Sequence, residues 1–244
     1  MRARYLCTFI AVILLTLPLA ANAQRGAMVL HQNLAQMVKQ ASYIVRGRVV
    51  SARVEQHPQF ENLATVVVTL RVEETLKGQV GETYTFRQYI WDIRDRFNAA
   101  GYRKGQHLLL LLRKPSEYGL SSPIGLSQGR FRIRTDAEGN LHAVNGAGNL
   151  GLLRGVEIEP QPQSPPEPPP LVEPPDQEEE ELELEGSRRS RPRAQPVRPP
   201  VRQRPVLAPS RLAEIVRQHR GGPLPLEQLR DLIRALARSA RRLR

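Results

Sequence analysis

A low-complexity segment over residues 159–209 divides this chain and limits which parts of it can fold. It opens with a proline run at 165–170, continues through an acidic run at 178–181 and ends in an arginine-rich run at 188–193. Proline lacks the N–H that helices and sheets need, and few apolar side chains remain here to offset the entropy of ordering. The composition predicts a disordered, proline-rich linker over residues 157–209, so a core must come from the segments on either side.

Charge is arranged along the chain in blocks of opposite sign. Residues 24–156 carry 18 Lys and Arg against 10 Asp and Glu, residues 157–185 carry 11 acids and no base, and residues 186–244 carry 16 Arg against 3 acids. The formal net charge of +12 therefore hides a compositionally biased, bipolar tail. Opposite blocks attract at short range, so the tail either compacts at low salt or acts as a solvated spacer without a partner.

The first 23 residues have the pattern of a cleavable export signal. Arg2 and Arg4 precede an apolar run over residues 6–20, and small residues occupy the −3 and −1 positions before a cleavage point between Ala23 and Gln24. The run is shorter than the roughly 20 residues of a spanning helix, which disfavours the alternative of a retained anchor. We expect an exported protein that is periplasmic, envelope-associated or secreted, with no transmembrane segment in the mature chain.

Export also restricts the chemistry of the protein. Cys7 is the only cysteine and lies inside the predicted signal, so the mature chain has no disulfide, thiolate nucleophile or cysteine ligand. Its stability must come from ordinary packing of apolar side chains.

Residues 28–156 show the alternation of a β-rich domain. Val66, Val68, Leu70 and Val72 share one face of a strand over residues 64–74, and five consecutive leucines at 108–112 indicate a strand buried on both faces. Further strands are predicted at 43–50, 83–91, 129–135 and 141–144, with a bulge at Gly47 and a preceding helix at 29–40 whose apolar face holds Leu30, Leu34, Met37 and Val38. We expect a mainly β fold, a small barrel of five or six strands that is closed or partly open.

The C-terminal segment, residues 210–244, has the pattern of two basic amphipathic helices. Ser210 is the expected N-cap of the first, and Gly221 and Gly222 stop it. The second has an apolar stripe of Leu229, Leu232, Ile233, Leu236, Ala240 and Leu243 opposite Arg230, Arg234, Arg238 and Arg241. Two interpretations stay open: the stripe packs on the barrel and the arginines stay in solvent, or the helix lies on an anionic membrane surface.

Several stretches together resemble an uncharacterised family of exported bacterial proteins. They lie within residues 30–154, at 41–49, 72–78, 102–106, 115–116, 119–125, 128–132 and 149–152, and residues 222–226 with the following helix are similar to the ends of such proteins. The resemblance implies that the low-complexity segment is an insertion between the barrel and its own last helix, and it supplies no catalytic residues. The order of elements is also similar to netrin-type, OB-like barrels. Netrin-type modules are cysteine-rich, so their inhibitor chemistry does not carry over to this chain.

Motifs for catalysis are weak. Residues 125–129 match G-x-S-x-G around Ser127, but Pro123 and the following strand pattern do not fit the strand–turn–helix of a hydrolase elbow. Asp92 and Asp95 are candidates for acids or calcium ligands, or they pair with neighbouring arginines in a surface turn.

The histidines also fail to form a metal-binding motif. Their positions are His31, His57, His107, His142 and His219, without metal-ligand spacing. We therefore predict no enzyme activity, no cofactor and no metal.

Arginines form the candidate binding site. Arg130, Arg132 and Arg134 alternate on one strand face, and we expect Arg46, Arg48 and Arg71 to flank them. Guanidinium groups suit phosphate and carboxylate, although such a face can also serve only for solubility. Because export separates the protein from chromosomal DNA, we expect anionic lipid, envelope polysaccharide or an acidic protein as the partner, and not nucleic acid.

These observations predict an exported, non-enzymatic binding or interaction module. Two alternatives stay open. One is an exported hydrolase-type enzyme with a site built from loops around Trp91 and residues 121–123. The other is a partner or inhibitor of an exported protease.

Overall fold

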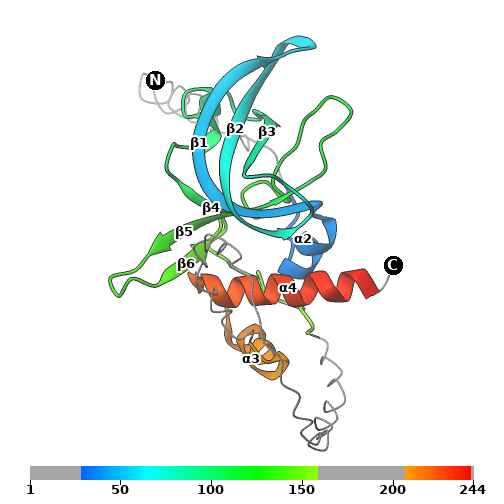
Figure 1. Ribbon diagram of the computed structural model, residues 1–244, viewed down its shortest axis with the longest axis vertical. Coiled ribbons are helices and arrows are strands. Elements are labelled where there is room, and N and C mark those ends of the chain that lie inside the picture. The colour runs from blue at the N-terminus through cyan, green and yellow to red at the C-terminus, as the bar shows by residue number, and fades with distance from the viewer. Residues whose placement is uncertain (1–28, 159–206, 243–244) are drawn as a thin grey trace, which may run out of the picture.

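The strands of the folded body form one antiparallel sheet. The computed structural model describes residues 29–158 and 207–242, so the predicted cleavage point at Ala23 and Gln24 and nearly all of the predicted linker lie outside the described residues. Within them the sheet has seven strands in the order β3-β2-β1-β4-β5-β6-β7 (Figure 1). The strands are β1 Tyr43–His57, β2 Phe60–Lys77, β3 Thr83–Tyr89, β4 His107–Leu112, β5 Arg130–Thr135, β6 Leu141–Val144 and β7 Leu224–Pro225. The helices are α2 Leu34–Gln40, α3 Pro209–Gln218 and α4 Leu226–Arg242, with two short 3₁₀ turns, η1 Ile93–Arg96 and η2 Ala99–Gly101.

The mainly β class is confirmed, but the strand count and closure differ from the prediction. Seven strands are present instead of five or six, and β3 and β7 form two separate edges, so the sheet is not closed. The additional strand is β7, a two-residue strand from the C-terminal segment that pairs with β6. β1 and β2 have 15 and 18 residues, where the alternation predicts short strands, and together they form a long curved hairpin (Figure 1).

Gly47 makes the bulge that the sequence predicts. The register between β1 and β2 shifts between Arg46 and Gly47. A Cβ atom at Gly47 would lie 2.3 Å from the carbonyl oxygen of Arg71, closer than any side chain tolerates. Only glycine allows the two backbones to approach this closely, which is what a bend in a paired strand requires.

The leucine run of β4 separates two apolar cores, and its burial on both faces is confirmed. Leu109 and Leu111 belong to a core that includes α2, α4 and β5. Leu108, Leu110 and Leu112 belong to a second core with the apolar face of β2, where Val66, Val68 and Leu70 are buried as predicted. Because both faces of β4 are buried, its sequence does not alternate between apolar and polar residues, and five leucines follow one another.

The N-terminal helix is shorter than predicted. It begins at Leu34 because Asn33 forms a capping box with Gln36, in which each side chain accepts a hydrogen bond from the backbone N–H of the other residue. Leu34, Met37 and Val38 are buried as expected, whereas Leu30 precedes the cap and is 86% exposed. Leu30 is therefore not part of the apolar face.

The C-terminal helices complete the first core. Leu229, Leu232 and Ile233 of α4 are fully buried in the same cluster as α2. Of the two interpretations of the apolar stripe, packing against the sheet is therefore the correct one. Helix α3 begins at Pro209 after Ala208, without a side-chain cap, so the predicted cap at Ser210 is wrong; proline fits the first turn because the N–H it lacks has no partner there. Among residues 29–158 and 207–242, no helix has the length and apolar character needed to cross a bilayer.

Candidate functional site

The arginines of β5 project from the sheet on the side away from α4. Register pairs Arg132 with Leu108 and Arg130 with Leu110, whose side chains lie in the second core, so Arg130, Arg132 and Arg134 share that face. Arg132 and Arg134 are exposed, and neither has a hydrogen-bond or ion-pair partner among the described residues. They are cations held on a rigid strand and available to a ligand.

Arg130 is engaged within the protein. Its Nη1 donates a 2.7 Å hydrogen bond to the carbonyl oxygen of Ala100, and its guanidinium carbon lies 4.6 Å from the centre of the Tyr102 ring. This cation–π contact joins β5 to η2.

Arg46 and Arg48 do not flank this group as free cations. Arg46 Nη1 lies 2.7 Å from Glu73 Oε2 and its Nε lies 3.1 Å from Glu74 Oε2, while Arg48 Nε lies 3.1 Å from Glu73 Oε1. Register also pairs Arg46 with Leu109, which faces the first core. The six predicted arginines therefore do not form one surface.

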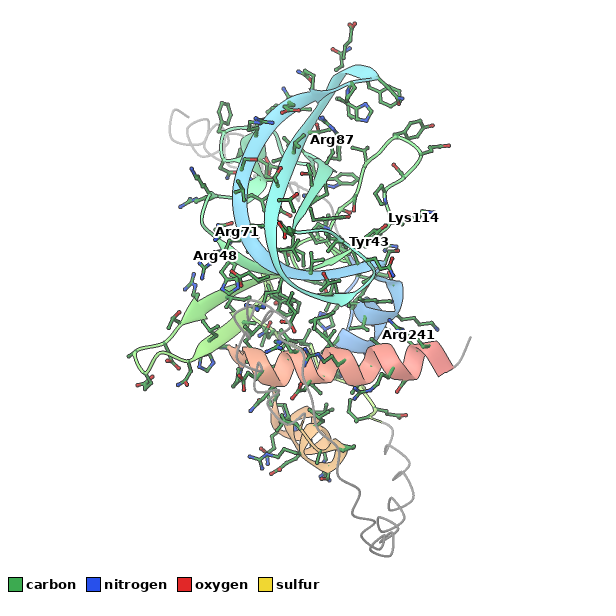
Figure 2. The ribbon with its side chains drawn as sticks, in the orientation of Figure 1. Tyr43, Arg48, Arg71, Arg87, Lys114 and Arg241 are labelled. Atoms are coloured by element: carbon green, nitrogen blue, oxygen red, sulfur yellow. The ribbon has the colours of Figure 1, made fainter. Side chains whose placement is uncertain are left out.

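Among the six predicted arginines, Arg71 is the third that is exposed with no side-chain partner in the described residues. It lies directly opposite Arg48 across the β1–β2 pair, and both extend from the curved hairpin in Figure 2. Two like charges at one register position repel, and Glu73 beside Arg48 offsets part of that repulsion.

Glu74 is the centre of an ion-pair network between the sheet and α4. Its Oε1 lies 2.7 Å from Arg230 Nη2 and 2.7 Å from Arg234 Nη2, and its side chain is only 14% exposed. Arg230 and Arg234 therefore share this carboxylate with Arg46, and Arg234 also lies 3.6 Å from Asp231. Nothing in the sequence pattern marks Glu74 as their partner, because 156 residues separate it from Arg230.

His107 lies at the edge of this network. Its Nε2 is 2.9 Å from Glu73 Oε2, and the ring is nearly buried. Burial lowers the pKa of His107 below its usual value, and Arg48 and Arg46 lower it further against the opposing effect of Glu73. At neutral pH the ring is uncharged and acts as a hydrogen-bonding group.

A small cleft of about 240 Å³ lies where the β3–β4 connection meets the loop before β5. Its lining residues are Gln88, Trp91, Asp92, Asp95, Ala100, Tyr102, Pro123, Leu126, Ser127 and Arg130. The structure thus brings Trp91 and Pro123 together, as the loop-built alternative predicts. Ser121 and Ser122 do not line the cleft, and the Ser121 hydroxyl donates to the carbonyl oxygen of Arg113 at 2.8 Å.

Structural contacts already occupy several polar groups of the cleft. Asp92 accepts from the Arg94 backbone N–H at 2.9 Å, capping η1, and also pairs with its guanidinium, which raises the pKa of Arg94. The Tyr102 hydroxyl donates to Gln88 at 2.9 Å, and burial raises the pKa of Tyr102. The predicted pairing of Asp92 with a neighbouring arginine is confirmed.

The G-x-S-x-G stretch does not form a hydrolase elbow. Ser127 lies in a turn that leads into β5, not between a strand and a helix. No histidine is among the residues that line the cleft. Leu126 and Ala100 have φ angles of 54° and 53°, so two non-glycine residues of the lining are held in the left-handed region.

The histidines and acids do not converge elsewhere. Within the part of the chain that the structure describes, no group of three or more His, Cys, Asp or Glu side chains is arranged to hold a metal ion. His142 Nε2 lies 2.7 Å from Asp136 in the β5–β6 turn, and His57 Nε2 lies 2.8 Å from the Tyr118 carbonyl oxygen. Both histidines have structural contacts.

The geometry defines a β-rich protein with exposed arginines on β5 and a small cleft between the β3–β4 connection and the loop before β5. No protein family, no curated protein and no solved structure matches this chain. The resemblance to a family of exported proteins stays a prediction.

Proposed function

We propose that this protein is an exported, non-enzymatic binding module for an anionic partner. The observation that supports this is a contrast among its arginines. Arg46, Arg48, Arg230 and Arg234 are ion-paired with Glu73 or Glu74, whereas the side chains of Arg71, Arg132 and Arg134 are exposed without a partner among the described residues. Arg132 and Arg134 share one face of β5, so one phosphate or carboxylate ligand can contact both. Arg71 pairs with Arg48 on the other face of the sheet and is a separate exposed cation.

The compartment limits the partner. The export pattern at residues 1–23 directs the protein to the envelope, where anionic lipid headgroups, acidic polysaccharides and acidic proteins are the available polyanions. A protein with a basic surface gathers such ligands by long-range attraction that salt screens.

We also propose that β1–β4 form a partly open, OB-like barrel. Isolated bridges support this: Arg87 of β3 pairs with Leu120, and Leu112 of β4 pairs with Pro123. The segment that holds Leu120 and Pro123 thus contacts both sides of the second core and encloses it.

The test compares two double variants of the mature chain with equal loss of charge. Arg132→Gln/Arg134→Gln removes the exposed pair on β5, and Arg238→Gln/Arg241→Gln removes two exposed arginines of α4, one of them near its C-terminal end (Figure 2). Co-sedimentation with anionic vesicles and retention on an immobilised acidic polysaccharide are measured. We expect the β5 variant to lose at least about tenfold in affinity for one of the two ligands, and the α4 variant to lose much less. Equal losses, or no binding by the parent protein, would contradict the proposal.

The cleft favours one other function, an enzyme with a loop-built site. Asp95 and Ser127 both line it, beside two residues with left-handed backbone. The test is an esterase and glycosidase screen of the mature chain, repeated with the Asp95→Asn and Ser127→Ala variants. Activity that either substitution abolishes would replace the binding module with an enzyme.

A further inference from the structure

The connection between β3 and β4 leaves three large apolar side chains in solvent. Trp91 is 57% exposed, Ile93 is 63% exposed and Phe97 is 89% exposed, all within seven residues. Single exposed apolar residues are common, but an aromatic and aliphatic group gathered on one short loop marks an interaction site.

The loop is built to hold these side chains outward. Asp92 caps η1 and pairs with Arg94, and the backbone N–H of Phe97 donates to the carbonyl oxygen of Arg94 at 3.1 Å. Trp91 contacts Tyr89 edge-on, with ring centres 4.7 Å apart. These contacts order the backbone without burying Ile93 or Phe97, so the apolar surface is a fixed feature of the folded chain.

Exposed cations lie on the same connection as the apolar group. Arg96, Arg103 and Lys104 are exposed on the same connection, and among the described residues none of their side chains has an ion-pair partner. Arg130 is bonded to Ala100 of this connection, and Arg132 and Arg134 follow on the same face of the sheet. Of the two acids in the loop, Asp92 is paired with Arg94.

We propose that this connection, residues 90–106, is the edge by which the protein docks on an anionic lipid bilayer. Trp91, Ile93 and Phe97 would enter the boundary between headgroups and acyl chains, where aromatic side chains are favoured, while the exposed cations bind lipid phosphates. The exposed cations of the connection disfavour a second copy of this chain as the partner, because two such loops would repel. The inference rests on the proposed function and names its partner as lipid.

The fluorescence of Trp91 can be used to test this proposal. Trp91 is the only tryptophan in the sequence, so tryptophan emission of the mature chain reports on this loop alone. The protein is titrated with vesicles of phosphatidylcholine and with vesicles that also contain phosphatidylglycerol, and lipids brominated on the acyl chain serve as quenchers. We expect a blue shift and quenching with the anionic vesicles and neither with the neutral ones.

Two double variants, each of which removes two exposed apolar side chains, separate insertion of the loop from non-specific hydrophobic binding. Ile93→Ser/Phe97→Ser removes the loop side chains but keeps Trp91, and Leu30→Ser/Leu150→Ser removes two exposed leucines outside the loop. We expect the loop variant to lose vesicle affinity by about tenfold or more and the control to stay near the parent.

The outcomes distinguish this inference from the proposed function. Salt-sensitive sedimentation with anionic vesicles but no change in Trp91 emission overturns membrane insertion and leaves an anion-binding module. Binding to an acidic polysaccharide without binding to vesicles does the same. Failure to bind either the anionic vesicles or the acidic polysaccharide overturns both.

Discussion

Arg230 on α4 donates two hydrogen bonds to one carboxylate oxygen of Glu74 on β2, from Nη2 at 2.7 Å and from Nε at 3.1 Å. Arg234 binds the same oxygen, and Arg46 binds the other. Together with the buried leucines of α4, this network makes residues 207–242 part of the same folded body as residues 29–158. The last helix thus contributes buried side chains to the core that the first part of the chain begins.

Removing the carboxylate charge of Glu74 should destabilise the fold strongly. Glu74→Gln removes the counter-ion that Arg46, Arg230 and Arg234 share at a largely buried position, and it leaves Arg230 without an ion-pair partner among the described residues. Loss of one partner of such a network costs about 3 kcal/mol in the free energy of unfolding. Urea denaturation measures it, with Glu82→Gln, an exposed acid outside the network, as the control. Equal stability of the two variants would show that the network contributes little.

Gly47→Ala should also lower the free energy of unfolding. The added Cβ would clash with the carbonyl oxygen of Arg71 at 2.3 Å, so the two long strands must separate or slip. We expect a loss of about 2 kcal/mol or more. Gly81→Ala is the matched control, because its Cβ would make only an ordinary 3.9 Å contact. Thermal unfolding midpoints compare them, and a G47A midpoint close to that of G81A would contradict the account of the bulge.

The stripe of α4 should behave as core and not as a membrane-binding face. Leu232 is fully buried, so Leu232→Ala should lower the free energy of unfolding by about 3 kcal/mol. Arg238→Gln, on the exposed side of the same helix, should change it little. If L232A were as stable as the parent and bound vesicles less well, the packing described for α4 would be wrong.

Sequence periodicity predicts elements whose burial is set by their own residues. The hydrophobic pattern predicts the alternation of β2 and the burial of β4 on both faces. The missing side chain of Gly47 predicts the bulge. Strand β7 has only two residues and depends on β6 for its existence, so no pattern marks it. The start of α2 depends on a hydrogen bond between Asn33 and Gln36, which a hydrophobic count does not detect.

Strand alternation in the sequence predicts only part of the candidate site. Arg132 and Arg134 follow from the period of two in β5, and both are exposed. Arg46 and Arg48 fail as flanking cations because their acids, Glu73 and Glu74, come from the neighbouring strand. The exposure of Ile93 and Phe97 is a tertiary property, since a short loop with apolar residues can equally well fold inward.

Stability should fall as the pH drops below about 6.5, the usual pKa of histidine. Burial lowers the pKa of both His107 and His219 in the folded state. Below pH 6.5 the unfolded chain therefore takes up protons that the folded chain does not. The contribution of the two neutral histidines to the free energy of unfolding is complete above pH 6.5, and it is lost as the pH falls toward the lowered pKa values. Denaturant unfolding between pH 7.5 and 5.5 should show the decline, and His107→Gln/His219→Gln should flatten it. An unchanged slope in the double variant would assign the decline to other groups.

The most direct test of the central claim is the dissociation constant for anionic vesicles at low and at high salt, for the mature chain and for the two double arginine variants. The account predicts that the parent binds at low salt and weakens at high salt, that Arg132→Gln/Arg134→Gln binds weakly at both, and that Arg238→Gln/Arg241→Gln follows the parent. Equal dissociation constants for the two variants at low salt would mean that only total charge matters, and the exposed arginines of β5 would not be a binding site.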